Sequence, residues 1–352
     1  VLDRFYTAPI STPTRAGLMT GRYPNRFGIR TTVIPPWRED GLDENEETLA
    51  DMLARNGYSN RAIIGKWHLG HTRKVHYPIN RGFSHFYGHL NGAIDYFDHM
   101  REGELDWHND WETCYDKGYS TELITQEAVR CINTYEKEGP FLLYVAYNAP
   151  HTPLQAQEKD IELYCDDFGS LTPKEQKRVT YQAMVSCMDR GIGTIVDALK
   201  KKGIMDNTFL IFFSDNGPAG VPGSSSGKLR GRKFDEWDGG VRVPAVFYWK
   251  RAESNYKNLS SQVTGFVDIV PTLKELVGDK NRPERAYDGI SILPLLIGST
   301  SCIDRNFYLG CGAVVNKDYK LIRKGRKPGL NLPQDFLVDY QTDPYEKKNA
   351  SN

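Results

Sequence analysis

Three apolar runs limit the folds open to this chain more than any other feature. They lie at residues 141–147, 208–213 and 243–249, and segments with helical periodicity separate them. The first run, FLLYVAY, is almost continuously apolar, which is typical of a strand buried on both faces of a parallel sheet. The pattern predicts an α/β fold with a mainly parallel central sheet and helices on both of its faces.

Capping residues and apolar periodicity place the helices. Thr172-Pro173 is expected to open the longest helix, and Ser120 to cap a second one. The expected helices cover residues 49–56, 120–138, 172–201 and 268–277, and a short strand covers residues 59–65. Helices and strands thus alternate along most of the chain, as the α/β prediction requires.

The chain is long enough for two compact units. Its 352 residues exceed the length at which a single core usually suffices. After about residue 301 the pattern changes to short strands at 318–323 and 335–339, which favour a small antiparallel sheet. We therefore expect an α/β domain at residues 1–300 and a C-terminal subdomain at residues 301–352.

Composition excludes several classes of function. Lys and Arg together number 45, as do Asp and Glu, so the chain has no overall positive field for nucleic acid. No apolar run is long enough to span a bilayer. The six cysteines form no C-x-x-C pair, which argues against zinc sites and thioredoxin-like chemistry. Free thiols are the simplest interpretation, and an isolated disulfide is the alternative.

One short segment near the start combines residues in an unusual way. Residues 11–15 read STPTR and are followed by AGLMTGR. The ordinary interpretation is a helix start, in which Ser11 or Thr12 caps the N-terminus and Pro13 lies in the first turn. In such a helix Arg15 lies one turn after Ser11 on the same face, where it can bond to the serine hydroxyl.

Polar residues follow three of the predicted strands, at the sheet edge where ligands bind in open α/β folds. The candidates are Lys66 and His68 in GKWHLG, His151 in NAPHTPL, and Asp215 and Asn216 in SDNG. A histidine suits proton transfer near neutral pH, and adjacent carboxylate and amide oxygens suit a hard cation such as calcium. The alternative interpretations are a solvated lysine, a histidine in a surface loop and an Asx turn.

A basic segment completes the series. Residues 229–233 (LRGRK) end at Lys233 and lie shortly before EWDGGVRVP at residues 236–244. In this order and over nearly the whole chain, the motifs resemble the type I, formylglycine-dependent sulfatases of the alkaline phosphatase superfamily. The sequence is most similar to the arylsulfatase B (N-acetylgalactosamine-4-sulfatase) type, with a serine-type motif.

The resemblance implies a sulfuric ester hydrolase that acts on a sulfated carbohydrate, with a glycosaminoglycan-type N-acetylgalactosamine sulfate as the expected substrate. In that family the residue matching Ser11 is oxidised to formylglycine, whose hydrate is the nucleophile. The matching roles are then nucleophile support for Arg15 and His68, sulfate binding for Lys66 and Lys233, contact with the leaving-group oxygen for His151, and calcium binding for Asp215 and Asn216.

The resemblance also implies partners and a location. Serine-type members are mostly bacterial and are matured by an anaerobic radical enzyme, so we expect a formylglycine-generating partner. A sulfated carbohydrate substrate implies a periplasmic or extracellular protein. At the substrate end of the site we expect four aromatic or imidazole side chains, His99, Trp107, His108 and Trp111.

The chain departs from the family pattern in two places that matter. Family members carry an Asp-Asp pair upstream of the nucleophile that completes the calcium site, and none appears near the start here. We therefore expect the sequence to be a piece of a longer protein that lacks one central strand. Ser11 replaces the commoner cysteine, which fits a native serine-type member or an engineered replacement. Asp238 stands where the family usually has Glu.

Two other functions remain open at this point. A phosphodiesterase or phosphonate hydrolase of the same superfamily would keep the metal-bearing sheet, but those enzymes lack the paired GKWHLG and second-lysine pattern. A non-catalytic, sulfoglycan-binding relative would have an unconverted Ser11 and an incomplete metal site.

Overall fold

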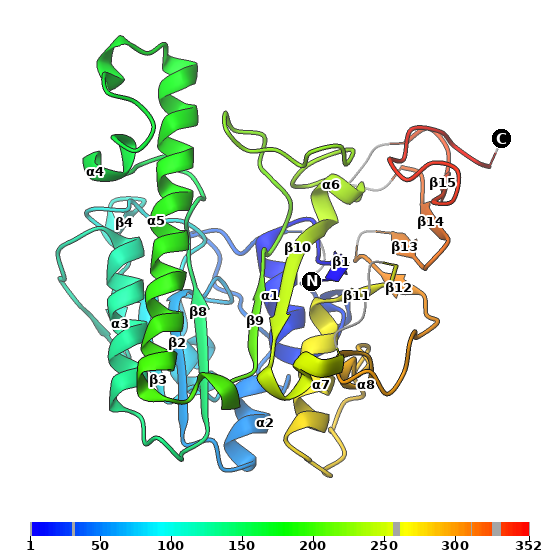
Figure 1. Cartoon of the computed structure of the whole chain (residues 1–352), viewed down its shortest axis with the longest axis horizontal. Helices are drawn as coiled ribbons and strands as arrows, with labels where there is room; N and C mark the ends of the chain where they lie inside the picture. The colour runs from blue at the N-terminus through cyan, green and yellow to red at the C-terminus, as the bar shows by residue number, and fades with distance from the viewer. Residues whose placement is uncertain (1, 30–31, 256–260, 311, 326–331, 352) are drawn as a thin grey trace.

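Two sheets form the centre of the molecule (Figure 1). The computed structural model describes residues 2–29, 32–255, 261–310, 312–325 and 332–351, and Cys311 lies outside them. The first sheet has the strand order β7-β6-β3-β2-β8. Its strands are β2 (Asn60–Lys66), β3 (His85–His89), β6 (His108–Asn109), β7 (Glu112–Thr113) and β8 (Phe141–Ala146). β2 runs parallel to both β3 and β8, as the sequence predicted for the centre of the fold.

The second sheet is mixed, with the strand order β11-β1-β10-β9. Its strands are β1 (Leu2–Tyr6), β9 (Leu210–Phe213), β10 (Arg242–Tyr248) and β11 (Thr264–Gly265). β10 is antiparallel to both β1 and β9, and only β1 and β11 are parallel. The two apolar runs here were expected to be buried strands of a parallel sheet. That detail was wrong: β9 is an edge strand with Phe212 partly exposed, and Val246 of β10 also reaches solvent.

Helices cover both faces of the first sheet, as expected. On one face lie α3 (Ser120–Thr134) and α5 (Pro173–Lys202), which pack along each other. On the other lie α1 (Ser11–Thr20), α2 (Leu49–Arg55) and α7 (Ile269–Leu276), whose core also takes in β10. Alternate residues of β2 serve the two layers: Ile64 packs into the cluster with α3 and α5, and Ile63 into the cluster with α1 and α2.

Capping explains most of the helix boundaries. Thr172 caps α5 with a capping box to Glu175, as predicted, and Thr48 caps α2 through Asp51 in the same way. The predicted cap of α3 was wrong, because its N-cap is Tyr119 and makes no side-chain cap bond. That helix also ends at Thr134, before the predicted end at residue 138.

A small antiparallel sheet closes the C-terminal part of the chain. It consists of β12 (Phe307–Tyr308), β13 (Ala313–Val315), β14 (Tyr319–Ile322) and β15 (Phe336–Asp339), in that order. Its apolar side chains share one core cluster with Tyr6 of β1. The sheet agrees with the sequence prediction, whereas the boundary at residues 300 and 301 stays a prediction.

The remaining elements are short. They include the hairpin of β4 (Met100–Arg101) and β5 (Glu104–Leu105), and the single-turn helices α4 (Glu158–Ile161), α6 (Asp238–Val241) and α8 (Leu293–Leu296). The five cysteines within the described residues are free thiols. None of the helices in the described ranges has the length and hydropathy needed to cross a membrane.

Candidate active site

Ser11 is the first residue of α1 and points into the protein rather than capping the helix. The N-cap position belongs to Ile10, so the ordinary capping interpretation of Ser11 was wrong. The Ser11 Oγ atom donates to Asp215 Oδ2 at 2.7 Å and accepts from Arg15 Nε at 2.9 Å. Because Arg15 follows Ser11 by one helical turn, α1 itself fixes this pair. The site therefore centres on the beginning of α1.

Arg15 ties this centre to the two sheets. Its guanidinium donates to the Lys66 carbonyl at 2.9 Å, to the Tyr144 hydroxyl at 3.2 Å and to Asp215 at 3.0 Å. Burial alone would raise the pKa of Asp215, but the charges of Arg15 and Lys66 hold that pKa well below its usual range. Asp215 is therefore a carboxylate that holds both Ser11 and Arg15.

Lys66 and His68 enter the site from the end of β2. The His68 Nδ1 atom lies 3.3 Å from Ser11 Oγ. Since the serine proton goes to Asp215, the oxygen accepts from His68, which places a proton on Nδ1. His68 has a φ of 61°, an uncommon left-handed conformation for a residue other than glycine. Its backbone amide donates to the Leu90 carbonyl at 3.0 Å, which helps to hold that conformation.

His151 and Lys233 face each other beside this centre. The His151 Nε2 atom lies 3.3 Å from Lys233 Nζ, and His151 Nδ1 lies 2.7 Å from the Thr152 carbonyl oxygen. A carbonyl only accepts, so Nδ1 carries the proton and Nε2 presents its lone pair to the lysine. Burial and the charges of Lys66 and Lys233 lower the pKa of His151 to about 3. The imidazole is therefore neutral in the free protein at neutral pH.

The positive groups around Ser11 crowd one another. Burial, followed by the charge of Arg15, places the pKa of Lys66 well below its ordinary value, and burial also lowers that of Lys233. Burial and the charge of Lys66 lower the pKa of His68 in the same way. An anion bound between these groups would relieve the repulsion and raise the pKa of each group. The arrangement therefore favours a bound anion next to Ser11.

Asp215 and Asn216 offer oxygen atoms of the kind that calcium prefers. The Asn216 amide nitrogen donates to the Gly217 carbonyl at 2.9 Å, and its Oδ1 atom is buried with no hydrogen-bond partner among the described residues. A buried acceptor of this kind suits a hard cation, as does the Asp215 carboxylate. Calcium takes 6–8 oxygens, so this pair fits calcium in kind and supplies only part of a complete shell.

The sequence comparison decides the family. The sequence profile of the sulfatase family matches residues 1–279 of the chain. The chain belongs to the sulfatase family. Arylsulfatase J of Mus musculus is 35% identical over 301 residues, which cover 83% of this chain and 49% of that protein. N-acetylgalactosamine-6-sulfatase of Mus musculus is 32% identical over 318 residues, covering 83% of this chain and 58% of its own length. The chain thus spans about half the length of these curated relatives.

A solved structure supports the same assignment. The crystal structure of Ps i-CgsB in complex with k-i-k-neocarrahexaose matches the chain with a TM-score of 0.87 and 30% sequence identity. The match covers 99% of this chain and 80% of the other. The α/β fold, with its separate antiparallel sheet near the C-terminus, is therefore that of a sulfatase.

Two residues that support the site were not foreseen. Tyr144 lies in an apolar strand sequence. That sequence does not indicate that the tyrosine hydroxyl accepts a hydrogen bond from Arg15. Asp106 accepts from the backbone amides of Leu90 and Asn91 at 2.9 and 2.8 Å, and so anchors the segment that carries the acceptor for His68. Only the folded structure brings Tyr144 and Asp106 close to the candidate active site.

The four side chains expected at the substrate end do not form an open surface. Trp107 and His99 are buried and stack with ring centroids 4.5 Å apart, and His108 is buried with its Nε2 atom 3.0 Å from Asp106. Trp111 stacks on Tyr77 at 6.4 Å. The sequence did not indicate how deeply the first three are buried, and the role expected for the four at the substrate end stays a prediction. The buried three form part of the support behind the β2 and β3 ends.

Proposed function

We propose that this chain hydrolyses sulfate esters of carbohydrates, with Ser11 as the site of the nucleophile. The observation that carries the proposal is the set of contacts at Ser11, where Asp215, Arg15 and His68 meet one hydroxyl. Lys66 lies buried at the end of β2, and a bound anion would raise its lowered pKa. One activated oxygen beside an anion site is the arrangement that transfer of a sulfuryl group requires.

Each cation has a task in this reaction. Lys66 and Lys233 bind the sulfate oxygens and neutralise the charge that builds up on them as the sulfur–oxygen bond breaks. Arg15 and His68 hold the Ser11 oxygen in position through their hydrogen bonds. These groups are fixed in place before substrate arrives, so the site needs little reorganisation during the reaction.

His151 serves the leaving group. Its neutral ring in the free protein has no proton on Nε2, but a bound sulfate anion offsets the charges of Lys66 and Lys233 and raises the pKa of the ring. Nε2 then holds a proton that it donates to the departing sugar oxygen. The Thr152 carbonyl keeps the other nitrogen protonated and fixes the direction of the ring.

Two groups complete the proposed chemistry. Conversion of Ser11 to formylglycine supplies an aldehyde hydrate, which is a stronger nucleophile than a serine hydroxyl. Asp215 and Asn216 would hold calcium, with the buried Asn216 Oδ1 as the free acceptor. The proposal needs a maturation enzyme for Ser11 as a partner.

The proposed substrate is a glycosaminoglycan-type N-acetylgalactosamine sulfate. Its support is the relative named N-acetylgalactosamine-6-sulfatase and the complex of Ps i-CgsB with an oligosaccharide. The sequence resembles the N-acetylgalactosamine-4-sulfatase type, and this relative is named a 6-sulfatase, so both esters belong in the assay. A substrate of this kind also supports a periplasmic or extracellular location.

The test compares sulfate and phosphate esters on matured protein. The chain is produced anaerobically with a serine-type maturation enzyme, and peptide mass spectrometry measures the loss of two hydrogens at Ser11. Sulfate release from the 4-sulfate and 6-sulfate of N-acetylgalactosamine is then measured, with the matching phosphate esters and a Ser11→Ala variant as controls.

We expect sulfate release that scales with the converted fraction and is absent in S11A. Faster turnover of the phosphate esters would favour a phosphodiesterase-like enzyme instead. Full conversion without turnover, together with binding of the sulfated sugar, would favour a sulfoglycan-binding protein.

A further inference from the structure

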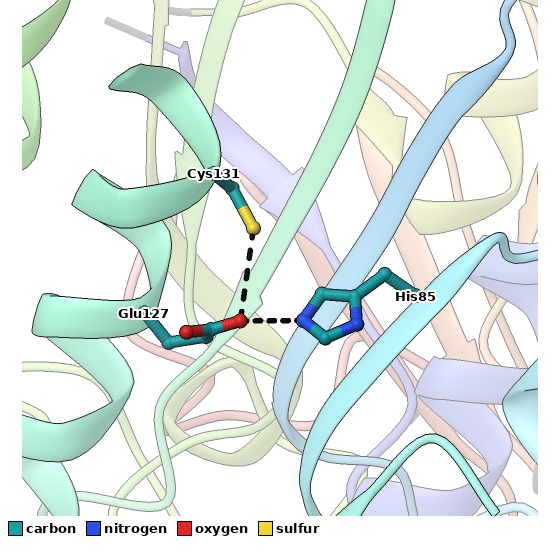
Figure 2. A group of neighbouring side chains, drawn as sticks. All are labelled: His85, Glu127 and Cys131. Carbon is teal, nitrogen blue, oxygen red and sulfur yellow. Dashed lines mark hydrogen bonds and ion pairs between the residues drawn. The ribbon is translucent and has the colours of Figure 1, made fainter. Parts of the chain in front are cut away.

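Three side chains with metal-binding atoms converge far from Ser11, between α3 and β3. They are His85, Glu127 and Cys131 (Figure 2). His85 is the first residue of β3, and Glu127 and Cys131 are four residues apart on one face of α3. Their nearest nitrogen, oxygen and sulfur atoms all lie within 4.8 Å of one another. This is the only such group of three or more among the residues that the structure describes.

The ligand atoms are close to the spacing of a tetrahedral metal site. His85 Nε2 lies 2.5 Å from Glu127 Oε1, and Cys131 Sγ lies 3.9 Å from the same oxygen. Bond lengths of about 2.0–2.3 Å around zinc place neighbouring ligands about 3.3–3.6 Å apart. Small rotations of Glu127 and Cys131 would bring the three atoms to that spacing and leave a fourth position for water.

A second carboxylate fixes the histidine from behind. His85 Nδ1 lies 2.9 Å from Asp110 Oδ1, which turns Nε2 toward Glu127 and Cys131. Histidines that bind metals commonly donate their other nitrogen to a carboxylate in this way. Asp110 Oδ1 is itself held by the backbone amide of Phe86 at 2.8 Å. The orientation of the ring is therefore set by the sheet and does not depend on the metal.

We propose that His85, Glu127 and Cys131 form a binding site for a divalent transition metal of the zinc class. Imidazole and thiolate ligands select such ions over calcium and magnesium, which prefer oxygen alone. The sequence has no C-x-x-C pair and therefore did not indicate this site. One of its ligands comes from a strand and two come from a helix.

Two carboxylates beside His85 favour a cation here. The His85 Nδ1 atom faces Asp110 Oδ1, and its Nε2 atom faces Glu127 Oε1. Arg130 Nη2 donates to the ligand oxygen Glu127 Oε1 at 2.6 Å, and its Nε donates to Oε2 at 2.7 Å. A bound metal would displace the first of these bonds and leave the second.

The site is reachable and separate from the active site. A surface cavity of about 370 Å³, lined in part by Tyr87, Glu127 and Arg130, opens beside it and offers an entry path. His85 and His89 mark the two ends of β3, and four steps of about 3.3 Å place the site about 13 Å from the active-site end of the strand. The metal would therefore be structural and would fasten α3 to the sheet.

Cobalt and zinc test this proposal in the presence of excess calcium. Metal-free protein is titrated with Co²⁺, and the near-ultraviolet absorption of a cobalt–thiolate bond is followed, which calcium ligands cannot produce. Zinc affinity is measured by competition with a chelating dye, and thermal unfolding is followed with and without zinc. The variants are Cys131→Ser, His85→Gln and Asp110→Asn, with Cys165→Ser as the matched control on another part of the chain.

We expect one cobalt per chain with the thiolate absorption, and a higher Tm with zinc. Cys131→Ser should lose the absorption and His85→Gln should weaken zinc binding at least tenfold, while Cys165→Ser behaves as wild type. Asp110→Asn should keep the absorption and bind about 10–100-fold more weakly. Thiolate absorption that survives in both Cys131→Ser and His85→Gln, or equal zinc affinity in all variants, would overturn the proposal. Either variant suffices if the other does not fold.

Discussion

The hydroxyl of Ser11 donates to Asp215 Oδ2 at 2.7 Å, although 204 positions separate the two residues in sequence. Thr14 strengthens the same junction, because its hydroxyl donates to the Asp215 backbone carbonyl at 2.7 Å. The first two turns of α1 and the loop after β9 are therefore joined by one carboxylate-bearing residue. Removal of the Asp215 charge should therefore affect Ser11, Arg15 and the binding of the proposed calcium at the same time.

We predict that Asp215→Asn weakens calcium binding and lowers sulfate release about 100-fold or more. The amide keeps the shape of the carboxylate and removes the charge that pairs with Arg15. Calorimetric titration with calcium and sulfate release from the matured variant provide the measurements. Asp206→Asn, an exposed carboxylate on the same part of the chain, is the control. Wild-type turnover in D215N would remove Asp215 from the proposed mechanism.

The pKa of His151 should rise when Lys233 loses its charge. Burial is the first cause of the value of about 3, and the charges of Lys66 and Lys233 follow. Lys233→Gln removes one of these charges, so the folded pKa should move up while staying below the model-peptide value of 6.5. The His151 ring signals, followed by NMR against pH, give the measurement, and Lys228→Gln is the control.

The same shift has a consequence for stability. The unfolded chain binds a proton near pH 6.5 that folded His151 does not bind until about pH 3. His151 therefore makes the fold less stable as pH falls from about 6.5 to about 3. Lys233→Gln raises the folded pKa of His151 and should narrow this pH range. An unchanged His151 titration in K233Q would show that the two side chains do not interact in solution.

The sequence could predict the parts of the site that follow from local chemistry. Arg15 follows Ser11 by one helical turn, so their contact is a property of any helix with these residues. It could not predict Tyr144 or Asp106, because their roles arise from pairing between strands distant in sequence. The direction of β10 was also hidden, since an apolar run looks the same in parallel and antiparallel sheets.

Gly92 allows His68 to occupy its place. A Cβ atom on Gly92 would lie 2.5 Å from His68 Nε2. We predict that Gly92→Ala displaces the ring and lowers kcat about tenfold or more, because small displacements of positioned groups are costly. Gly193→Ala is the matched control. Within the described part of the chain, no atom beyond its chain neighbours and its own helix backbone lies within 4 Å of its Cβ position, and alanine favours the α5 helix. Equal turnover of the two variants would show that His68 tolerates the displacement.

Lys320 links the C-terminal sheet to the α/β core through buried ion pairs. Its fully buried Nζ donates to Asp238 Oδ1 at 2.9 Å and to Glu346 Oε1 at 2.8 Å. Asp238 stands where the family usually has Glu, and it accepts from the Tyr340 hydroxyl at 3.0 Å as well. The two buried carboxylates thus share one cation. Loss of that cation removes the ion pair of Glu346 and leaves Asp238 with the longer ion pair to Arg242 at 3.4 Å.

We predict that Lys320→Met lowers the free energy of unfolding by about 3–5 kcal/mol, the range for breaking a buried ion pair. Methionine keeps most of the side-chain volume, so the loss reports on charge rather than packing. Denaturant unfolding measures the effect, and the exposed Lys324→Met is the control, with a change expected within about 0.5 kcal/mol. Adding Glu346→Gln to K320M should recover part of the loss, because it removes the carboxylate charge that K320M leaves without its lysine partner. Equal stability of K320M and K324M would mean that the carboxylates take up protons at little cost and that packing alone holds the sheet.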